Sequence, residues 1–339
     1  MASTRSPRIR QRFVLTGIML VCLCSFIAWQ IMKPRYLLSG VTNSCFNAEY
    51  IAPDTLLAVG NRKLYEFKGQ NYSESTILYA SETRLFSLGI HRDSPVKVIV
   101  GDLEGRIHFP ETDLAPVKAI GGVVFACGIK TSWDSSECTI IAAGHDGVQD
   151  MGWGGNVRLI RYNGKTLELG KNYEFEWTPK SLCIARKSNT IIVGCASKEV
   201  IHIDLDTDMR KTIRVEGGVI NCVLSHDENL LAVDEYESVT VRRVADLEEV
   251  IASIPIQKNE KRIHTCIRWH PTQPEVLMIA EAGVGIKLLN VFSQEIQLIK
   301  NPNITVPTTI WFSEHDHTFN LLQRDWRFMT MKLKNQNDH

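Results

Sequence analysis

The sequence lacks an excess of charge of either sign. Its 339 residues contain 38 Lys and Arg against 38 Asp and Glu, so the formal net charge is zero. Long-range attraction to nucleic acid or to an acidic membrane surface needs a charge imbalance, and this composition excludes recruitment by the surface as a whole. A partner therefore has to be selected by a local group of residues.

Motifs of common catalytic sites are also missing. The chain has no Gly-x-Ser-x-Gly nucleophile elbow, no His-Glu-x-x-His zinc motif and no phosphate-binding loop, and its ten His are scattered among predicted turns. The glycine-rich stretch 152–155 precedes no helix whose N-terminus could hold an anion. We therefore predict no enzymatic activity, no metal and no cofactor. An active site assembled from loops distant in the sequence remains an alternative.

Uncharged runs of membrane-spanning length are absent except near the N-terminus. Residues 13–32 carry no charge and match the hydrocarbon thickness of a bilayer at helical rise. We predict a transmembrane helix at 13–32 after a basic tail at 1–12. A buried helix would show a polar face, and a cleaved signal peptide would show a small-x-small cleavage site; these remain the alternatives.

Seven apolar runs recur along the rest of the chain at intervals of 40 to 50 residues. Most lie between two further short strands rich in β-branched residues, with Gly, Asp, Asn and Pro in the turns. A period of roughly 40–45 residues is typical of four-stranded propeller blades. We predict an all-β, seven-bladed propeller of four-stranded antiparallel blades over 35–333, with a tail at 334–339. The runs begin at Leu56, Lys97, Ile140, Thr190, Leu230, Val276 and Phe319.

The seventh repeat has room for only three strands before it ends near Leu333. An open strand edge invites pairing with another chain, so something should cover it. The stretch RYLLSG, residues 35–40, is an apolar strand directly before the first repeat. We predict that it supplies the missing fourth strand and closes the ring.

The stretches VINCVLSHDENLLAV (219–233) and IHTCIRWHPTQPEVLMIA (263–280) resemble WD-repeat proteins, in which an inner strand, a Ser/His-Pro/Asp turn and an apolar strand recur. The resemblance spans about residues 36–333. No repeat carries the Trp-Asp pair or the upstream Gly-His pair; IHIDL and IKLLNV stand where the former would be. The resemblance implies a scaffold that binds protein partners, identity unknown, through its loop faces, and the predicted span at 13–32 would anchor this scaffold to a membrane.

Two other functions remain open. The first is a lumenal hydrolase resembling the strictosidine synthase and paraoxonase-like propellers, which have six blades and an axial calcium. The second is a substrate receptor of a cullin-ring ubiquitin ligase. The sequence Arg324-Asp325-Trp326-Arg327 resembles the Asp-x-Arg docking motif of such receptors. Here it stands in the predicted turn between the second and third strands, whereas the docking motif follows the third strand.

An insertion in the third repeat is the predicted partner site. Residues 144–155, GHDGVQDMGWGG, replace what is usually a tight turn on the face of the blade-to-blade loops. An exposed Trp with a polar rim is typical of binding hot spots. The predicted partner-binding residues are therefore His145, Asp146, Asp150 and Trp153. The alternative is that Trp153 folds back and plugs the central funnel.

Nine cysteines are present, none in a Cys-x-x-Cys spacing, and Cys22 and Cys24 lie in the apolar N-terminal segment. Inside an innermost strand a cysteine packs as a small hydrophobe, so we predict buried free thiols. One disulfide, such as Cys127–Cys138, and a metal site are the alternatives. Four of the remaining cysteines fall in predicted innermost strands: Cys127, Cys183, Cys222 and Cys266.

Asp204, Asp206 and Asp208 alternate like the start of a calcium loop. The Gly required after the third acid is Met209, and the Glu required at the twelfth position is Val215. We interpret this stretch as a solvated turn between two strands.

The orientation follows from charges near the span. The cationic residues within the tail 1–12 outnumber those just after residue 32, which predicts a cytosolic N-terminus and a lumenal or extracellular propeller (type II), with the endoplasmic reticulum as a candidate organelle. Two sequons, at Asn71 and Asn303, agree with glycosylation there. Free thiols suit a reducing cytosol instead, so the opposite orientation remains open.

Overall fold

The computed structural model describes residues 35–38, 44–52, 55–69, 72–131, 136–146, 154–257, 265–315 and 317–332. The chain divides into two units, residues 1–36 and residues 37–339. In the first unit the described part is the short strand β1 (Arg35–Tyr36). The predicted tail at 1–12, the predicted span at 13–32 and the predicted tail at 334–339 lie outside the described residues. Within the described ranges, no helix has the length and apolar character needed to cross a bilayer.

The described strands form seven four-stranded antiparallel sheets, so the predicted seven-bladed propeller is confirmed. The innermost strands of blades 1 to 7 are β2 (Cys45–Ala52), β6 (Leu85–Ile90), β10 (Val124–Thr131), β14 (Pro179–Ile184), β18 (Val219–Leu224), β22 (Thr265–Trp269) and β26 (Pro307–Ser313). The second strands are β3 (Thr55–Gly60), β7 (Val98–Asp102), β11 (Cys138–His145), β15 (Thr190–Cys195), β19 (Leu230–Glu235), β23 (Val276–Glu281) and β27 (Thr318–Gln323).

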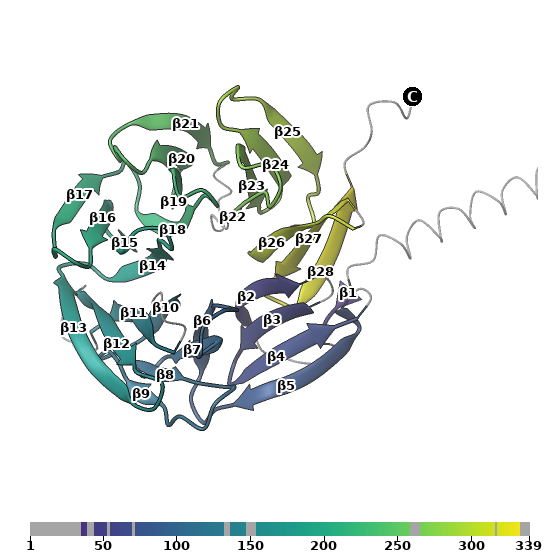
Figure 1. Cartoon of the computed structure of the whole chain (residues 1–339). Helices are drawn as coiled ribbons and strands as arrows, with labels where there is room; N and C mark the ends of the chain where they lie inside the picture. Colours follow the sequence, from purple (N-terminus) through teal and green to yellow (C-terminus); the bar gives the residue numbers. More distant parts are fainter. Residues whose placement is uncertain are drawn as a thin grey trace, which may run out of the picture. The chain divides into compact units, whose positions relative to one another are not determined.

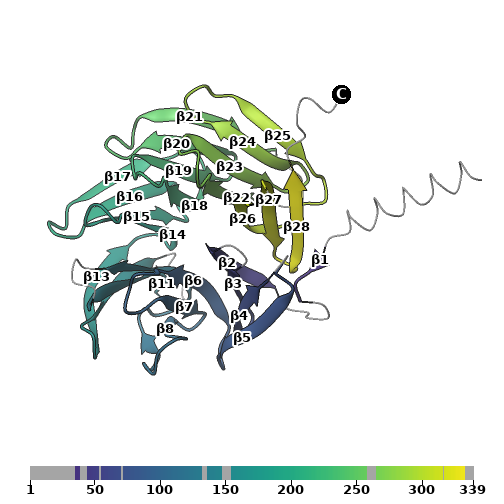
Figure 2. The same ribbon diagram turned by 45° about the vertical axis from the view of Figure 1, so that its right-hand side comes forward.

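The third strands are β4 (Lys63–Lys68), β8 (Arg106–His108), β12 (Gly155–Tyr162), β16 (Glu199–Asp204), β20 (Ser238–Arg243), β24 (Gly285–Asn290) and β28 (Arg327–Lys332). The outermost strands of blades 1 to 6 are β5 (Glu74–Ala80), β9 (Val117–Lys118), β13 (Leu167–Phe175), β17 (Arg210–Arg214), β21 (Val250–Pro255) and β25 (Ile296–Lys300). The innermost strands surround a central axis (Figure 1). Figure 2, turned by 45°, shows the outermost strands β5, β13, β17, β21 and β25 at the periphery.

The second strands explain why the repeat was visible in the sequence. In β7, β15, β19, β23 and β27 every residue is buried, because neighbouring blades cover both faces of the sheet. A strand buried on both faces reads as a continuous apolar run rather than an alternating one. Each of the seven predicted runs overlaps one of the seven second strands.

The apolar core of the described residues consists of seven clusters, and each cluster joins two consecutive blades. The cluster between blades 7 and 1 contains Trp311 and Trp326 on one side and Leu56 and Phe67 on the other. Side-chain packing between blades 7 and 1 therefore makes the propeller a closed ring. The separate prediction that residues 35–40 supply a closing strand stays a prediction.

Buried polar side chains end the second strands of three consecutive blades. Glu235, Glu281 and Gln323 are each the last residue of their strand and are nearly inaccessible to solvent. Each accepts a hydrogen bond from the backbone N–H of the loop that enters its blade: from Gly217 at 2.9 Å, from Gln257 at 2.6 Å and from Thr305 at 2.6 Å, respectively. Because a buried N–H without a partner is strongly unfavourable, these side chains fix the entering loops in place.

Candidate functional site

A β-bulge recurs at the same place in six blades. The register between the innermost strand and the next strand of the blade shifts by one residue, and the extra residue is always the second residue of the innermost strand. This holds for β2, β6, β10, β14, β18 and β26. A bulge re-aims the side chain of the extra residue. The six bulged residues are Phe46, Phe86, Phe125, Lys180, Ile220 and Thr308, and we call them the mouth ring. All except Phe86 line a cavity of about 450 Å³, the mouth cavity, enclosed by the innermost strands.

Three members of the mouth ring form an aromatic row with a cation at each end. Phe46 stacks on Phe86 at a centroid distance of 5.2 Å, and Phe125 meets Phe86 edge-on at 5.4 Å and 88°. The Lys180 Nζ lies 3.3 Å from the centroid of the Phe125 ring. At the other end, the Arg324 guanidinium lies 5.4 Å from the Phe46 ring. The row thus joins residues of blades 7, 1, 2, 3 and 4.

Neither end cation forms an ion pair with another residue in the described ranges. Both lie on aromatic faces, where the ring quadrupole attracts a cation. Partial burial of the Lys180 ammonium lowers its pKa to about 8. Lys180 is therefore a partly dehydrated cation that has no ion pair among the residues described by the structure.

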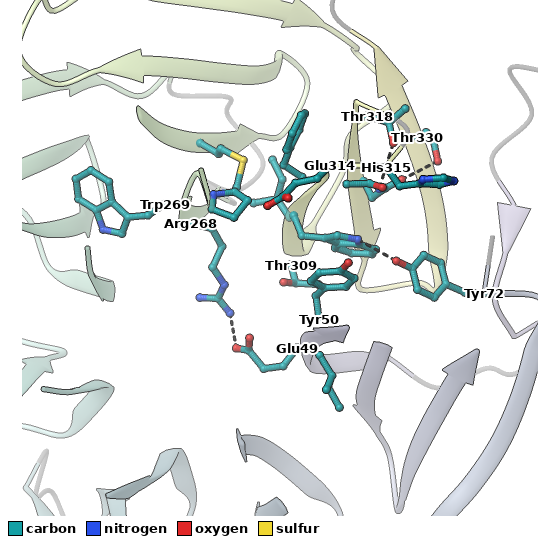
Figure 3. A pocket seen from close by; sticks show the side chains of 18 of the residues that line it. Glu49, Tyr50, Tyr72, Arg268, Trp269, Thr309, Glu314, His315, Thr318 and Thr330 are labelled. Carbon is teal, nitrogen blue, oxygen red and sulfur yellow. Dashed lines mark hydrogen bonds and ion pairs between the residues drawn. The ribbon is translucent and has the colours of Figure 1, made fainter. Parts of the chain in front are cut away.

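An ion pair crosses the central channel, which is the space enclosed by the innermost strands, next to the mouth ring. The Arg268 guanidinium, from β22, lies 2.5 Å from a carboxylate oxygen of Glu49, from β2. Figure 3 shows the two side chains reaching toward each other from different blades. The negative charge of Glu49 raises the pKa of Arg268. Both residues line the mouth cavity and also a second cavity of about 840 Å³, the far cavity, so the pair stands where the two meet.

The far cavity lies toward the ends of β2 and β26 and has an aromatic wall. Tyr50 stacks on Trp311 at 5.8 Å, and the Trp311 Nε1–H donates a hydrogen bond to the Tyr72 hydroxyl at 3.0 Å. Trp311 and Tyr72 are buried in the cluster between blades 7 and 1. These rings already fulfil a packing role, and we therefore place the candidate site at the mouth ring, whose Phe side chains are half-exposed.

Two of the predicted partner-binding residues lie beside the mouth ring. His145 ends β11 and Asp146 follows it, while Asp150 and Trp153 lie outside the described residues. The insertion begins at Gly144, which pairs with Val124, the residue before Phe125. It ends at Gly155, where a Cβ atom would overlap Pro179, the residue before Lys180. The base of the insertion therefore lies between Phe125 and Lys180.

The mouth ring was missed in the sequence, although a weak signal exists. When the innermost strands are aligned, the second position holds Phe in the first three blades: Phe46, Phe86 and Phe125. Lys180 occupies this position in the fourth blade. Aromatic residues in short strands are ordinary core residues, so only the bulge distinguishes these from packed side chains.

The structure describes one of the two predicted glycosylation sites and the whole of the predicted docking motif. Asn303 is exposed in the loop before β26, and Asn71 lies outside the described residues. Residues 324–326 form the turn between β27 and β28, with Trp326 fully buried, and Arg327 begins β28. The Arg327 Nε donates to the Asp325 carboxylate at 2.6 Å, so that part of the motif is engaged within its own blade.

The acidic stretch lies where we expected a turn between two strands: Asp204 ends β16, and residues 205–209 connect it to β17. Asp204 Oδ1 accepts the backbone N–H groups of Asp206 and Thr207, whereas the Asp208 carboxylate binds Lys171 and the Tyr173 hydroxyl. Among the described residues, no group of three or more His, Cys, Asp or Glu side chains is arranged to hold a metal ion.

All seven described cysteines are free, which confirms the prediction of unpaired thiols and excludes a Cys127–Cys138 disulfide in this structure. Six are buried, and Cys127 is half-buried. Burial raises the pKa of each thiol. A thiol with a raised pKa carries little thiolate, so these cysteines are poor nucleophiles.

Comparison with known proteins adds no family. The chain matches no protein-family model, and the comparison with curated proteins found no match. Its function is therefore inferred from the fold and from the mouth ring. Phe, Ile and Thr side chains with a single Lys can hold a ligand by stacking, apolar contact and charge.

Proposed function

We propose that the chain is a membrane-anchored, WD-repeat-like scaffold that binds protein partners at the mouth ring and catalyses no reaction. The observation that carries this proposal is the half-exposed aromatic row Phe46–Phe86–Phe125. Aromatic side chains that remain accessible on a rigid frame are typical anchors of protein interfaces, and Arg is enriched there with them.

The surroundings of the row support a protein partner. Each ring projects from a bulge in a strand that is paired within its sheet, so the backbone beneath the row is already ordered before a partner binds. The described ends of the insertion lie next to the row: Gly144 pairs with Val124, and His145 and Asp146 follow it as polar neighbours. In this proposal the insertion extends the contact area beyond the mouth cavity, and Trp153 and Asp150 contribute to it.

In the proposed arrangement, residues 13–32 anchor the scaffold to a membrane and the propeller lies on the lumenal or extracellular side. Exposure of Asn303 supports this orientation, since a glycan acceptor has to be accessible. The buried thiols are compatible with an oxidising compartment, because their raised pKa values make them slow to oxidise.

Partner capture by variants of the full chain tests the scaffold role. We expect Phe86→Ala, and separately the double variant Trp153→Ala with Asp150→Ala, to lose the same set of cross-linked partners, because both changes remove part of one contact surface. Phe292→Ala is the matched control, since Phe292 is 64% exposed on the outer part of blade 6, away from the mouth. Thermal unfolding is measured alongside.

Binding at the mouth ring would be contradicted if Phe86→Ala captured the same partners as the parent chain while Phe292→Ala lost some of them. A large fall in melting temperature for the Trp153→Ala, Asp150→Ala variant would make the insertion a structural plug.

A further inference from the structure

The mouth cavity has an uncompensated positive charge. Its charged lining residues in the described ranges are Glu49, Lys180 and Arg268. Glu49 and Arg268 neutralise each other at 2.5 Å, so among the described lining residues Lys180 has no counter-charge. Arg324, at the far end of the aromatic row, adds a second cation without an ion pair in the described residues. A dehydrated, unpaired ammonium is unfavourable until an anion binds it.

Resting on the proposed scaffold function, we propose that the mouth ring recognises an acidic segment of a partner protein. A carboxylate of that segment binds the Lys180 ammonium, and a neighbouring aromatic or large apolar side chain packs on Phe86 and Phe125. An acidic residue further along the segment meets Arg324. The ligand is thus an extended peptide in which acidic and aromatic or apolar residues alternate.

The geometry favours a peptide over other anions. Three rings separate the two cations, and each ring offers apolar contact that an inorganic phosphate or a lipid headgroup cannot use. Nucleic acid is disfavoured because its affinity depends on many phosphate contacts, whereas the net charge of the chain is zero. An acidic peptide with apolar neighbours uses both the cations and the rings.

Binding of synthetic peptide pools to the full chain in neutral detergent tests this inference. Three peptide pools have the same aromatic and aliphatic residues and differ only at fixed positions. These positions hold Asp and Glu in the acidic pool, Asn and Gln in the amide pool, and Lys and Arg in the basic pool. We expect the acidic pool to bind about tenfold more tightly than the amide pool, as for a partly dehydrated charge pair. Lys180→Met should abolish this difference, and Lys180→Arg should keep it.

Two further measurements keep the test independent of folding. Lys180→Glu should reverse the preference, so that the basic pool binds best; a misfolded variant would bind no pool. In the parent chain the acidic pool should bind more weakly as pH rises through about 8, where Lys180 loses its proton. In Lys180→Arg this loss should disappear, because Arg keeps its charge.

Equal binding of the acidic and amide pools would overturn the inference. So would Lys180-dependent binding of inorganic phosphate or of phosphatidylserine vesicles without binding of the acidic pool. If Phe86→Ala loses partners while no pool is preferred, the scaffold function stands and the acidic preference is wrong. If no pool binds and Phe86→Ala keeps all partners, both proposals fail.

Discussion

At the scale of single residues, Asp234 is the most unusual group in the described core. Its side chain is fully inaccessible to solvent in β19. One carboxylate oxygen accepts a hydrogen bond from the Thr265 hydroxyl at 2.5 Å, and the other, Oδ1, has no hydrogen-bond partner among the described residues. Burial raises the pKa of Asp234 to about 7; the Thr265 hydrogen bond opposes this rise, and the neighbouring Glu235 adds to it.

This shift predicts a pH-dependent stability with a defined sign. The folded-state pKa of about 7 lies above the ordinary aspartate pKa of 3.8. Asp234 therefore binds a proton on folding between these values, and its contribution to the free energy of unfolding falls as pH rises from about 4 to about 7, by on the order of 4 kcal/mol at most. Asp234→Asn cannot ionise, so we expect it to raise the melting temperature at pH 8 and to change it little at pH 4.

The measurement is thermal unfolding of the full chain from pH 4 to pH 9. Glu248→Gln removes an exposed carboxylate of the same blade and serves as the control. If the melting temperatures of Asp234→Asn and of the parent chain differed by the same amount at every pH, Asp234 would not titrate as expected.

At the scale of elements, the junction between blades 7 and 1 differs from the others because it joins the two ends of the repeat array. Trp326, in the turn after β27, packs beneath Gly60 at the end of β3, where a Cβ atom would overlap the indole ring. Leu37 and Leu38 pack against the same cluster. The backbone N–H of Leu37 also donates to the carbonyl of Trp326 at 3.0 Å.

Truncation of the chain tests the predicted closing strand at residues 35–40. We expect removal of 1–34 to leave a soluble, cooperatively folding propeller. Removal of 1–41 should cause aggregation, because it uncovers the Leu37 and Leu38 contact surface and leaves a strand edge unpaired. Size-exclusion chromatography and thermal unfolding distinguish the two chains. Equal solubility would show that packing between blades 7 and 1 closes the ring without this strand.

At the scale of the whole molecule, the orientation across a membrane decides which partners can reach the mouth ring. We expect glycans on Asn71 and Asn303, because the arginine-rich tail should retain the N-terminus in the cytosol and export the rest. Endoglycosidase treatment should then speed gel migration, and replacing both Asn with Gln should remove the effect. Unchanged migration, together with protease cleavage of the propeller outside sealed microsomes, would establish the opposite orientation.

The sequence by itself determined the repeat and the blade number, because each second strand is covered on both faces and so begins as a mostly apolar run. It left the first innermost strand, β2, unassigned, since CFNAEYIA mixes polar and apolar residues. Residues of β2 face the channel as well as the core: Glu49 lines the channel, and Ala48 is buried.

Only the tertiary structure decided the site. The mouth ring depends on a bulge, which is a property of the register between two strands and leaves no composition of its own. The Glu49–Arg268 pair joins residues 219 positions apart, and nothing local in either stretch specifies the other. The lack of an ion pair for Lys180 among the described residues has the same cause, because the blades that face each other across the axis decide whether a lysine meets a carboxylate.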